Sequence, residues 1–277
     1  MSKVPPIILN NGIEMPQLGF GVWQVPDDEA EQAVTTALES GYRSVDTASL
    51  YENEEGTGRA IAKSGIARDK LFVTTKLRNR HQGYDATLRA FDESLAKLGL
   101  DHVDLYLIHW PMPAKDTYID TYKAFEKILA DGRAKSIGVS NFLPEHLDRL
   151  IDATSVIPAV NQIELHPHLQ QRASRAYHGE QGIATEAWSP LGQGKGLLEV
   201  PAIVAIAQKH GRTPAQIVLR WHLQLGTVVI PKSVTPSRIK ENIEVFDFEL
   251  DPEDMAAISA LNEDRRLGPD PAAFEAP

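Results

Sequence analysis

The chain has 277 residues, of which 42% are hydrophobic, and it carries a formal net charge of −10. This length is within the range of single-domain barrels of alternating strands and helices, so we expect one domain over residues 1–277. The negative charge argues against binding to nucleic acids or to anionic membrane surfaces. The absence of cysteine excludes disulfide bonds, thiol catalysis and cysteine-ligated zinc. Because no segment resembles a signal peptide or a membrane span, we expect a cytoplasmic protein.

The first predicted element is a β-hairpin at residues 7–9 and 13–15, because the intervening Asn11-Gly12 accepts the positive φ of a tight turn. Short apolar runs then alternate with amphipathic patterns. The expected strands lie near 18–22, 43–46, 71–76, 103–109, 135–140, 159–164, 183–188 and 227–231. The expected helices lie near 28–40, 53–64, 85–98, 117–130, 144–153, 170–180, 200–210 and 235–245, with two extra helices near 214–225 and 252–261. This alternation predicts a parallel sheet, because parallel strands need crossover helices.

Two α/β architectures fit this alternation, an open doubly wound sheet and a closed barrel. The open sheet would be favoured by a Gly-x-Gly-x-x-Gly fingerprint after a strand. No such fingerprint is present: the Gly-x-Gly pairs at Gly19 and Gly192, for example, continue to Gln24 and Leu197 instead of a third glycine. We therefore predict a (β/α)8 TIM barrel with an N-terminal β-hairpin and two extra helices. The tail, 263–277, is expected to be a loop on the surface or over the mouth of the barrel.

Four polar residues follow the predicted strands in a pattern that suggests catalysis. Asp46 ends the second strand and Tyr51 follows it, Lys76 ends the third strand, and His109 ends the fourth. The carboxyl ends of barrel strands meet at one mouth, where the active sites of this fold lie. Each residue alone has a structural explanation: Asp46 and Lys76 could be only a buried ion pair, Tyr51 a rim aromatic, and His109 a satisfied strand-end histidine.

These residues also carry a resemblance to a known family. The motifs are DTASLYENE (46–54), Lys76, LIHWP (107–111), GVSNF (138–142), QIELHP (162–167), LGQGKG (191–196) and IPKS (230–233). Over residues 7–261, in order and spacing, they resemble the aldo-keto reductase family, and among its members the prokaryotic 2,5-diketo-gluconate reductases.

The four residues could together reduce a carbonyl group. Tyr51 could donate the proton if its pKa were lowered, and a lysine ammonium ~4 Å away would stabilise the phenolate by about 4 kcal/mol at an effective dielectric of about 20. Lys76 is expected to supply this charge and Asp46 to hold it ionised. A neutral His109 could hydrogen-bond the carbonyl oxygen. The resemblance implies the same four roles.

The hydride must come from a cofactor, because no side chain donates one. Residues 231–240 contain Lys232, Arg238 and Lys240 but no acidic residue, and Thr235-Pro236 is typical of a helix start. A basic helix N-terminus favours a phosphate, and hence NADPH through its 2′-phosphate. The alternative is a solvated helix face. The resemblance implies phosphate and adenine contacts from Lys232, Ser233, Val234, Arg238, Glu241 and Asn242.

The remaining expected cofactor contacts lie at strand ends and in one glycine-rich loop. Glycines in 192–196 would let backbone amides approach the pyrophosphate, although the segment alone predicts only a flexible loop. Trp188 could stack on the nicotinamide or could be plain core packing. The resemblance implies hydrogen bonds to the carboxamide and loop contacts from Ser140, Asn141, Gln162, Ser189, Leu191 and Gln193.

The substrate pocket is expected to lie between Trp23 and Trp110, and its apolar walls favour a small carbonyl compound. Two residues depart from the family pattern. Glu52 replaces the usual glycine after the tyrosine, and Arg78 replaces a frequent aromatic residue after Lys76-Leu77. Arg78 could reach the mouth and bind anionic substrates, or it could pair with Glu52 or point into solvent.

Three other functions compete with carbonyl reduction. A metal-dependent hydrolase could use the His166-Pro167-His168 segment, but this pair follows the sixth strand rather than an early one, so no metal is expected. A non-catalytic NADPH-sensing barrel would not need Tyr51 together with Lys76. A short-chain dehydrogenase is disfavoured because no tyrosine is followed by lysine four positions later. We expect a monomeric enzyme with a small carbonyl substrate and no nucleic-acid or membrane partner.

Overall fold

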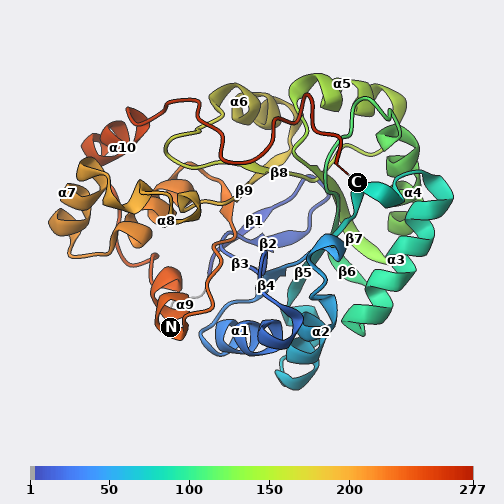
Figure 1. Cartoon of the computed structure of the whole chain (residues 1–277), viewed down its shortest axis with the longest axis horizontal. Helices are drawn as coiled ribbons and strands as arrows, with labels where there is room; N and C mark the ends of the chain where they lie inside the picture. Colours follow the sequence, from blue (N-terminus) through green and yellow to red (C-terminus); the bar gives the residue numbers. More distant parts are fainter. Residues whose placement is uncertain (1–3, 277) are drawn as a thin grey trace.

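A closed parallel sheet forms the centre of the computed structural model, which describes residues 4–276. The eight strands pair in chain order, all parallel, and helices surround them (Figure 1). The strands are β3 (Phe20–Gly21), β4 (Ser44–Asp46), β5 (Phe72–Leu77), β6 (Val103–Ile108), β7 (Ala134–Ser140), β8 (Val160–Glu164), β9 (Ala184–Trp188) and β10 (Val228–Val229). The predicted α/β barrel is confirmed.

The sheet closes where β3 meets β10. A parallel bridge joins Leu18 to Val229, and backbone N–H groups of Gly19 and Gly21 donate to the carbonyls of Val229 and Pro231 at 2.8 and 3.2 Å. Both strands are shorter than predicted because regular pairing at this seam is limited to these few contacts. The barrel therefore has no exposed sheet edge at this position.

Ten α-helices cover the outside of the described barrel, and their order confirms the two predicted extra helices (Figure 1). They are α1 (Asp27–Glu39), α2 (Glu54–Lys63), α3 (Tyr84–Leu98), α4 (Tyr118–Ala130), α5 (Pro144–Ala153), α6 (Arg172–Gln181), α7 (Pro201–His210), α8 (Pro214–Gln224), α9 (Pro236–Ile243) and α10 (Pro252–Ser259). No helix within residues 4–276 is both long and apolar enough to cross a membrane.

The predicted hairpin covers the N-terminal end of the barrel. It consists of β1 (Pro6–Ile8) and β2 (Glu14–Pro16), and Gly12 in its turn has φ +83°. Leu9 and Met15 are buried in one apolar cluster with residues of the barrel strands, such as Phe72. This end is thereby filled with side chains, and the functional cavity lies at the opposite end.

Asn53 connects two loops at the carboxyl ends of the strands. Its side-chain amide donates to the carbonyls of Val22 and Val25, both at 2.8 Å, and its Oδ1 accepts from the Thr47 hydroxyl at 2.7 Å. All of these groups are buried. The side chain thus fixes the segment before α2 against the β3–α1 loop.

We predict that Asn53→Ala lowers the free energy of unfolding by about 2–4 kcal/mol, because several buried polar groups lose their partners. A decrease in Tm of about 5–10 °C should follow, measurable by circular dichroism. Asn10→Ala is the matched control: the Asn10 amide also donates to two backbone carbonyls, those of Ile157 and Pro158, but it is exposed. Equal losses in the two variants would contradict this account.

Candidate active site

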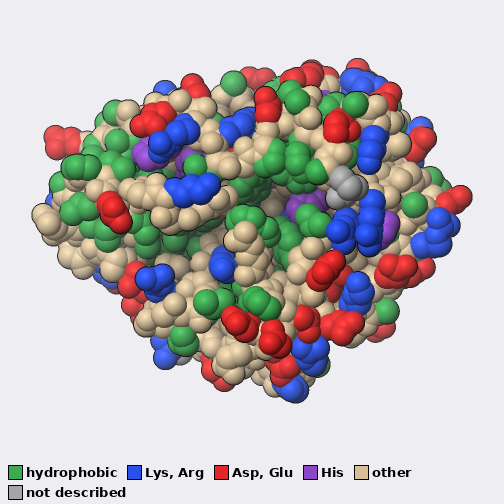
Figure 2. All heavy atoms as spheres, viewed as in Figure 1, with side chains coloured by type: hydrophobic (Ala, Val, Ile, Leu, Met, Phe, Trp, Pro, Cys, Tyr) green, Lys and Arg blue, Asp and Glu red, His purple; other side chains and the backbone are tan. Residues whose placement is uncertain are grey.

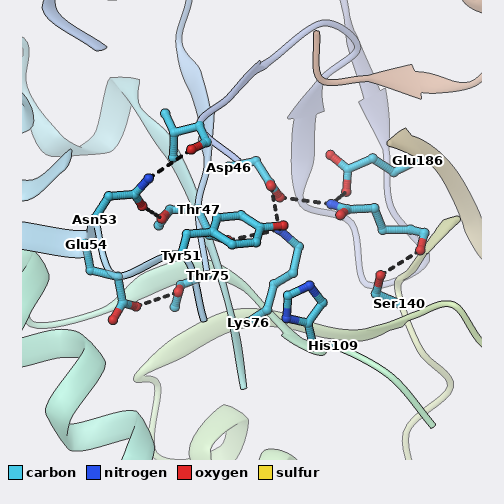
Figure 3. A network of polar contacts seen from close by, with 12 residues as sticks. Asp46, Thr47, Tyr51, Asn53, Glu54, Thr75, Lys76, His109, Ser140 and Glu186 are labelled. Carbon is cyan, nitrogen blue, oxygen red and sulfur yellow. Dashed lines mark hydrogen bonds and ion pairs between the residues drawn. The ribbon is translucent and has the colours of Figure 1, made fainter. Parts of the chain in front are cut away.

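The four residues predicted to act together do meet at the mouth of the barrel (Figure 3). Lys76 in β5 is fully buried, and its Nζ donates to Asp46 Oδ1 at 2.5 Å and to the Thr47 carbonyl at 2.9 Å. The same Nζ lies 3.5 Å from the hydroxyl of Tyr51, which belongs to a short 3-10 helix (Ser49–Tyr51) after β4. One ammonium group therefore contacts both the carboxylate and the phenol.

His109 also contacts Tyr51. It follows β6, and its ring meets the Tyr51 ring edge-on with centroids 5.6 Å apart. Burial, together with the nearby Lys76 charge, lowers the pKa of His109 well below its usual value. The imidazole is therefore neutral at physiological pH, as the sequence-based hypothesis requires, and it can hydrogen-bond a neutral ligand.

The predicted lowering of the Tyr51 pKa is wrong for the protein alone. Burial raises the pKa of Tyr51 above its usual value of 10.0, and the Lys76 ammonium opposes this effect only in part. Asp46, which keeps Lys76 charged, also raises the pKa of Tyr51, because its negative charge disfavours the phenolate. Tyr51 is consequently protonated at neutral pH, the form that a proton donor needs.

Lys76 keeps its charge in spite of complete burial. Burial by itself lowers the pKa of Lys76, but the attraction of Asp46, with smaller contributions from Tyr51 and Glu186, raises it above its usual value. A buried ammonium is tolerated only when it is paired and hydrogen-bonded in this way. The ion pair is thus the fixed charge of the site.

Sequence analysis missed Glu186, which extends this network. The Gln162 amide Nε2 donates both to Asp46 Oδ2 at 2.9 Å and to Glu186 Oε2 at 2.8 Å. A signal was present, because side chains two positions apart on a strand point to the same face and Trp188 was already assigned to the site.

A cavity of about 880 Å³ extends from Tyr51 and His109 to the start of α9. Figure 2 shows the hollow near the centre of this face, bordered by hydrophobic side chains. The predicted residues that line it are Trp23, Asp46, Tyr51, His109, Trp110, Ser140, Asn141, Gln162, Trp188, Ser189, Leu191, Gln193, Lys232, Ser233, Arg238, Glu241 and Asn242. The sequence motifs that are far apart along the chain therefore share one cavity.

Two predicted contact residues lie outside this cavity. The Arg78 guanidinium pairs with Glu52 Oε1 at 3.2 Å and does not line the cavity, so the structure follows the pairing alternative rather than the substrate-contact alternative. Val234 is 46% exposed and also does not line it. Its neighbours Lys232 and Ser233 do line the cavity, so only part of this predicted segment contributes side chains to it.

The far end of the cavity has the features of a phosphate site. Thr235 precedes α9 but makes no side-chain capping bond, and Pro236 occupies the first helical position. Lys232 and Arg238 border the cavity there, and neither forms an ion pair within residues 4–276. Uncapped helix N–H groups beside unpaired cations fit a bound phosphate group.

The near end presents polar groups that are already partly engaged. The Trp188 indole N–H donates to Asn141 Oδ1 at 2.7 Å, and the Asn141 amide donates to the His109 carbonyl at 3.0 Å. Both N–H groups of Gln162 are directed at carboxylates. Gln162 Oε1 is consequently the group that remains able to accept a hydrogen bond from a ligand amide.

The C-terminal tail crosses the mouth, as predicted (Figure 1). The Glu164 carboxylate accepts hydrogen bonds from the backbone N–H groups of Leu267 at 2.6 Å and Gly268 at 3.0 Å, and from His166 Nε2 at 2.9 Å. A Cβ on Gly268 would lie 2.6 Å from a ring carbon of Trp188. Glu164 thus holds the tail directly against Trp188.

A second set of contacts holds the end of the tail. The rings of Trp110 and Phe274 pack with centroids 4.4 Å apart, and the Asn79 amide donates to the Ala276 carbonyl at 2.9 Å. Near the start of the tail, His168 accepts a hydrogen bond from the Arg265 guanidinium at 2.7 Å. His166 and His168 therefore take part in the contacts that hold the tail. The described residues contain no cluster of three or more potential metal ligands.

We predict that Glu164→Gln loosens the tail. Burial opposes ionisation of Glu164, but the bonds from His166 and the tail amides outweigh it, so the pKa lies below its usual value of 4.5. The stabilisation is therefore fully present above that value and is lost as the pH falls. Amide hydrogen exchange at Leu267 and Gly268 should accelerate about 10- to 100-fold in the variant at pH 7.

The matched control is Glu263→Gln, which changes an exposed carboxylate at the start of the same tail. In the wild type, protection of the two amides should decrease as the pH falls below about 4.5, after correction for the intrinsic exchange rate. Unchanged protection in Glu164→Gln would show that the tail is held by other contacts.

Comparisons with known proteins agree with this geometry. Residues 17–263 match the aldo/keto reductase family. An aldo-keto reductase of Mycobacterium sp. (strain KMS) is 59% identical over 270 residues, 98% of each chain. The methylglyoxal reductase DkgA of Yersinia pestis is 54% identical over 275 residues, 99% of each chain. The crystal structure of a Gox0644 mutant in complex with NADPH has a TM-score of 0.95, with 52% identity and 99% of each chain covered. The chain therefore belongs to the aldo/keto reductase family.

Proposed function

We propose that the protein reduces small aldehydes, ketones, dicarbonyls or keto-sugars to alcohols with NADPH. The observation that carries this proposal is the Tyr51–Lys76–Asp46 contact, which faces one end of a cavity whose other end is basic. When bound, NADPH supplies the hydride. The relatives that reduce methylglyoxal or hold NADPH, each more than 50% identical to this chain, support the same reaction class.

Tyr51 is proposed to donate the proton to the carbonyl oxygen. The phenolate that forms lies beside the Lys76 ammonium, 3.5 Å from oxygen to nitrogen in the resting geometry. An ion pair at ~4 Å contributes about 4 kcal/mol at an effective dielectric of about 20, so this charge offsets much of the cost of phenolate formation. Asp46 keeps the lysine protonated, and neutral His109 orients the carbonyl oxygen toward Tyr51.

The cofactor is proposed to lie along the whole cavity. Lys232, Ser233 and Arg238 would bind the 2′-phosphate, while Glu241 and Asn242 lie where an adenine would bind. At the other end, Trp188 offers an aromatic face to the nicotinamide. The loop after β9, which lines the cavity through Ser189, Leu191 and Gln193, would cover the pyrophosphate.

The carbonyl compound is proposed to bind between Trp23, Trp110 and the tail. These walls are apolar and leave His109 and Tyr51 as the polar groups beside the substrate, which favours small neutral dicarbonyls such as methylglyoxal. One chain supplies every residue of the site, so we also propose that a single-domain monomer is active. A cytoplasmic location would give it access to NADPH.

We predict that Tyr51→Phe decreases kcat for methylglyoxal reduction by about 10²- to 10⁴-fold, because the general acid is lost. Loss of NADPH absorbance at 340 nm measures the turnover. NADPH affinity, measured by tryptophan fluorescence, should change little, and exposed Tyr84→Phe is the control. Tight NADPH binding by a wild type that turns over no carbonyl compound would instead support the non-catalytic sensing barrel.

Cofactor choice gives a separate prediction. Arg238→Ala should raise the KM for NADPH about 10- to 100-fold, because one charge-assisted hydrogen bond to the 2′-phosphate is lost, and should leave the KM for NADH nearly unchanged. Lys240→Ala is the matched control, since Lys240 is on the same helix but does not line the cavity. An equal effect on both cofactors would place the phosphate elsewhere.

A further inference from the structure

Glu186 is a buried carboxyl group connected to the proposed proton donor through other side chains, and it has no role in the mechanism above. It lies in the middle of β9 and is fully buried. Figure 3 shows it in one network with Tyr51, Lys76 and Asp46. The contacts run from Tyr51 to Lys76 and Asp46, and the Gln162 amide then connects Asp46 to Glu186. The Gln162 nitrogen donates one hydrogen to each carboxyl group, so Glu186 is connected to the ion pair through a single side chain.

The two carboxyl groups at the ends of this amide have different environments. Asp46 has the Lys76 ammonium at 2.5 Å in addition to Gln162. Among residues 4–276, Glu186 has only the shared amide as a partner, and its Oε1 is buried without a hydrogen bond. Two neighbouring carboxylates that share one cation do not ionise equally, and the less well paired one keeps its proton. Asp46 is therefore the ionised partner and Glu186 the neutral acid.

Few charged groups other than Asp46 and Lys76 surround Glu186 among the described residues. From the neighbouring elements, Asp46, Tyr51 and Lys76 face it, while β10 on its other side contributes only Val228 and Val229. Burial, followed by repulsion from Asp46, raises the pKa of Glu186 to about 8. In return, a charge on Glu186 raises the pKa of Tyr51.

We propose that Glu186 is a positioning residue for the proton donor: as a neutral acid it holds Gln162 against Asp46, and when it ionises its negative charge disfavours phenolate at Tyr51. With Glu186 neutral, Lys76 and Asp46 balance each other, and proton donation adds one negative charge to the network. With Glu186 ionised, the network already carries that charge before Tyr51 gives up its proton. The inference rests on the proposed function for its kinetic consequence only.

The proposal predicts that the rate of carbonyl reduction depends on pH through Glu186, a residue that does not touch the reacting atoms. Proton donation by Tyr51 should slow as the pH rises through about 8, because Glu186 ionises in this range. Glu186→Gln keeps an oxygen that accepts from Gln162 but cannot ionise. Its single-turnover rate of carbonyl reduction should match the wild type at pH 6.5 and exceed it by about 10-fold at pH 9.5, a change of the size that one neighbouring buried charge produces in a pKa.

Glu54→Gln is the matched control for the kinetic test. Glu54 is also a buried carboxyl group with a raised pKa, mainly because of burial, and its Oε1 accepts from Thr75 at 2.6 Å. Among the described residues, Glu54 makes no hydrogen bond to the network that connects Tyr51, Lys76, Asp46, Gln162 and Glu186. The ratio of its rate to that of the wild type should not change between pH 6.5 and 9.5.

A direct titration separates this proposal from the proposed function, because it needs no turnover. In protein labelled with ¹³C at the glutamate carboxyl carbon, one resonance should titrate near pH 8 and be missing from Glu186→Gln. Asp46→Asn should move its midpoint toward the usual range of glutamate, since the repelling charge is gone. These spectra also decide the charge state if Glu186→Gln folds poorly.

The outcomes distinguish the two claims. A Glu186 carboxyl that titrates near pH 4.5 would overturn the inference whether or not the protein reduces carbonyl compounds. A midpoint near 8 combined with parallel rate profiles for wild type and Glu186→Gln would overturn the link to Tyr51. Absence of carbonyl reduction with a midpoint near 8 would overturn the proposed function and the role at Tyr51, while leaving the neutral acid established.

Discussion

The buried ion pair between Lys76 and Asp46 is the interaction on which the site depends. A fully buried ammonium is costly unless it is paired and hydrogen-bonded, and here the Asp46 carboxylate and the Thr47 carbonyl satisfy it. Because both residues lie on adjacent barrel strands, the position of this charge is fixed by the sheet. Tyr51 then meets the charge from one side, and the Gln162 amide connects it to a second carboxyl group on the other.

The cavity has positive groups near both of its ends, although the chain as a whole is strongly acidic. The formal net charge is −10, yet one end of the cavity is lined by Tyr51, which contacts the buried Lys76 ammonium, and the other end by Lys232 and Arg238. Opposite ends of one cavity thus favour a developing phenolate and a bound phosphate. The tail adds an apolar cover, held by Glu164 on one side and by Trp110 and Asn79 on the other. This arrangement suits a dinucleotide whose reactive ring must be shielded from water.

Much of this could be predicted from the sequence, because the relevant signals are local. Alternating apolar runs predict the barrel, and polar residues at strand ends predict the meeting of Tyr51, Lys76 and His109. Side-chain direction in loops is less predictable: Arg78 pairs with Glu52, and Val234 is exposed. The rise in the Tyr51 pKa depends on the balance between burial and the charges of Lys76, Asp46 and Glu186, which only the three-dimensional arrangement reveals. Glu186 was missed because its importance comes from Gln162, a residue on a neighbouring strand.

The central claim is that one cavity holds the nicotinamide of NADPH against the Tyr51 hydroxyl. A crystal structure of the complex with NADP⁺ tests it most directly. The account predicts the 2′-phosphate at Lys232 and Arg238, the nicotinamide on Trp188, and room for a carbonyl group within ~3–3.5 Å of both the ring and Tyr51. A nicotinamide bound away from Tyr51, or a dinucleotide bound outside this cavity, would contradict it.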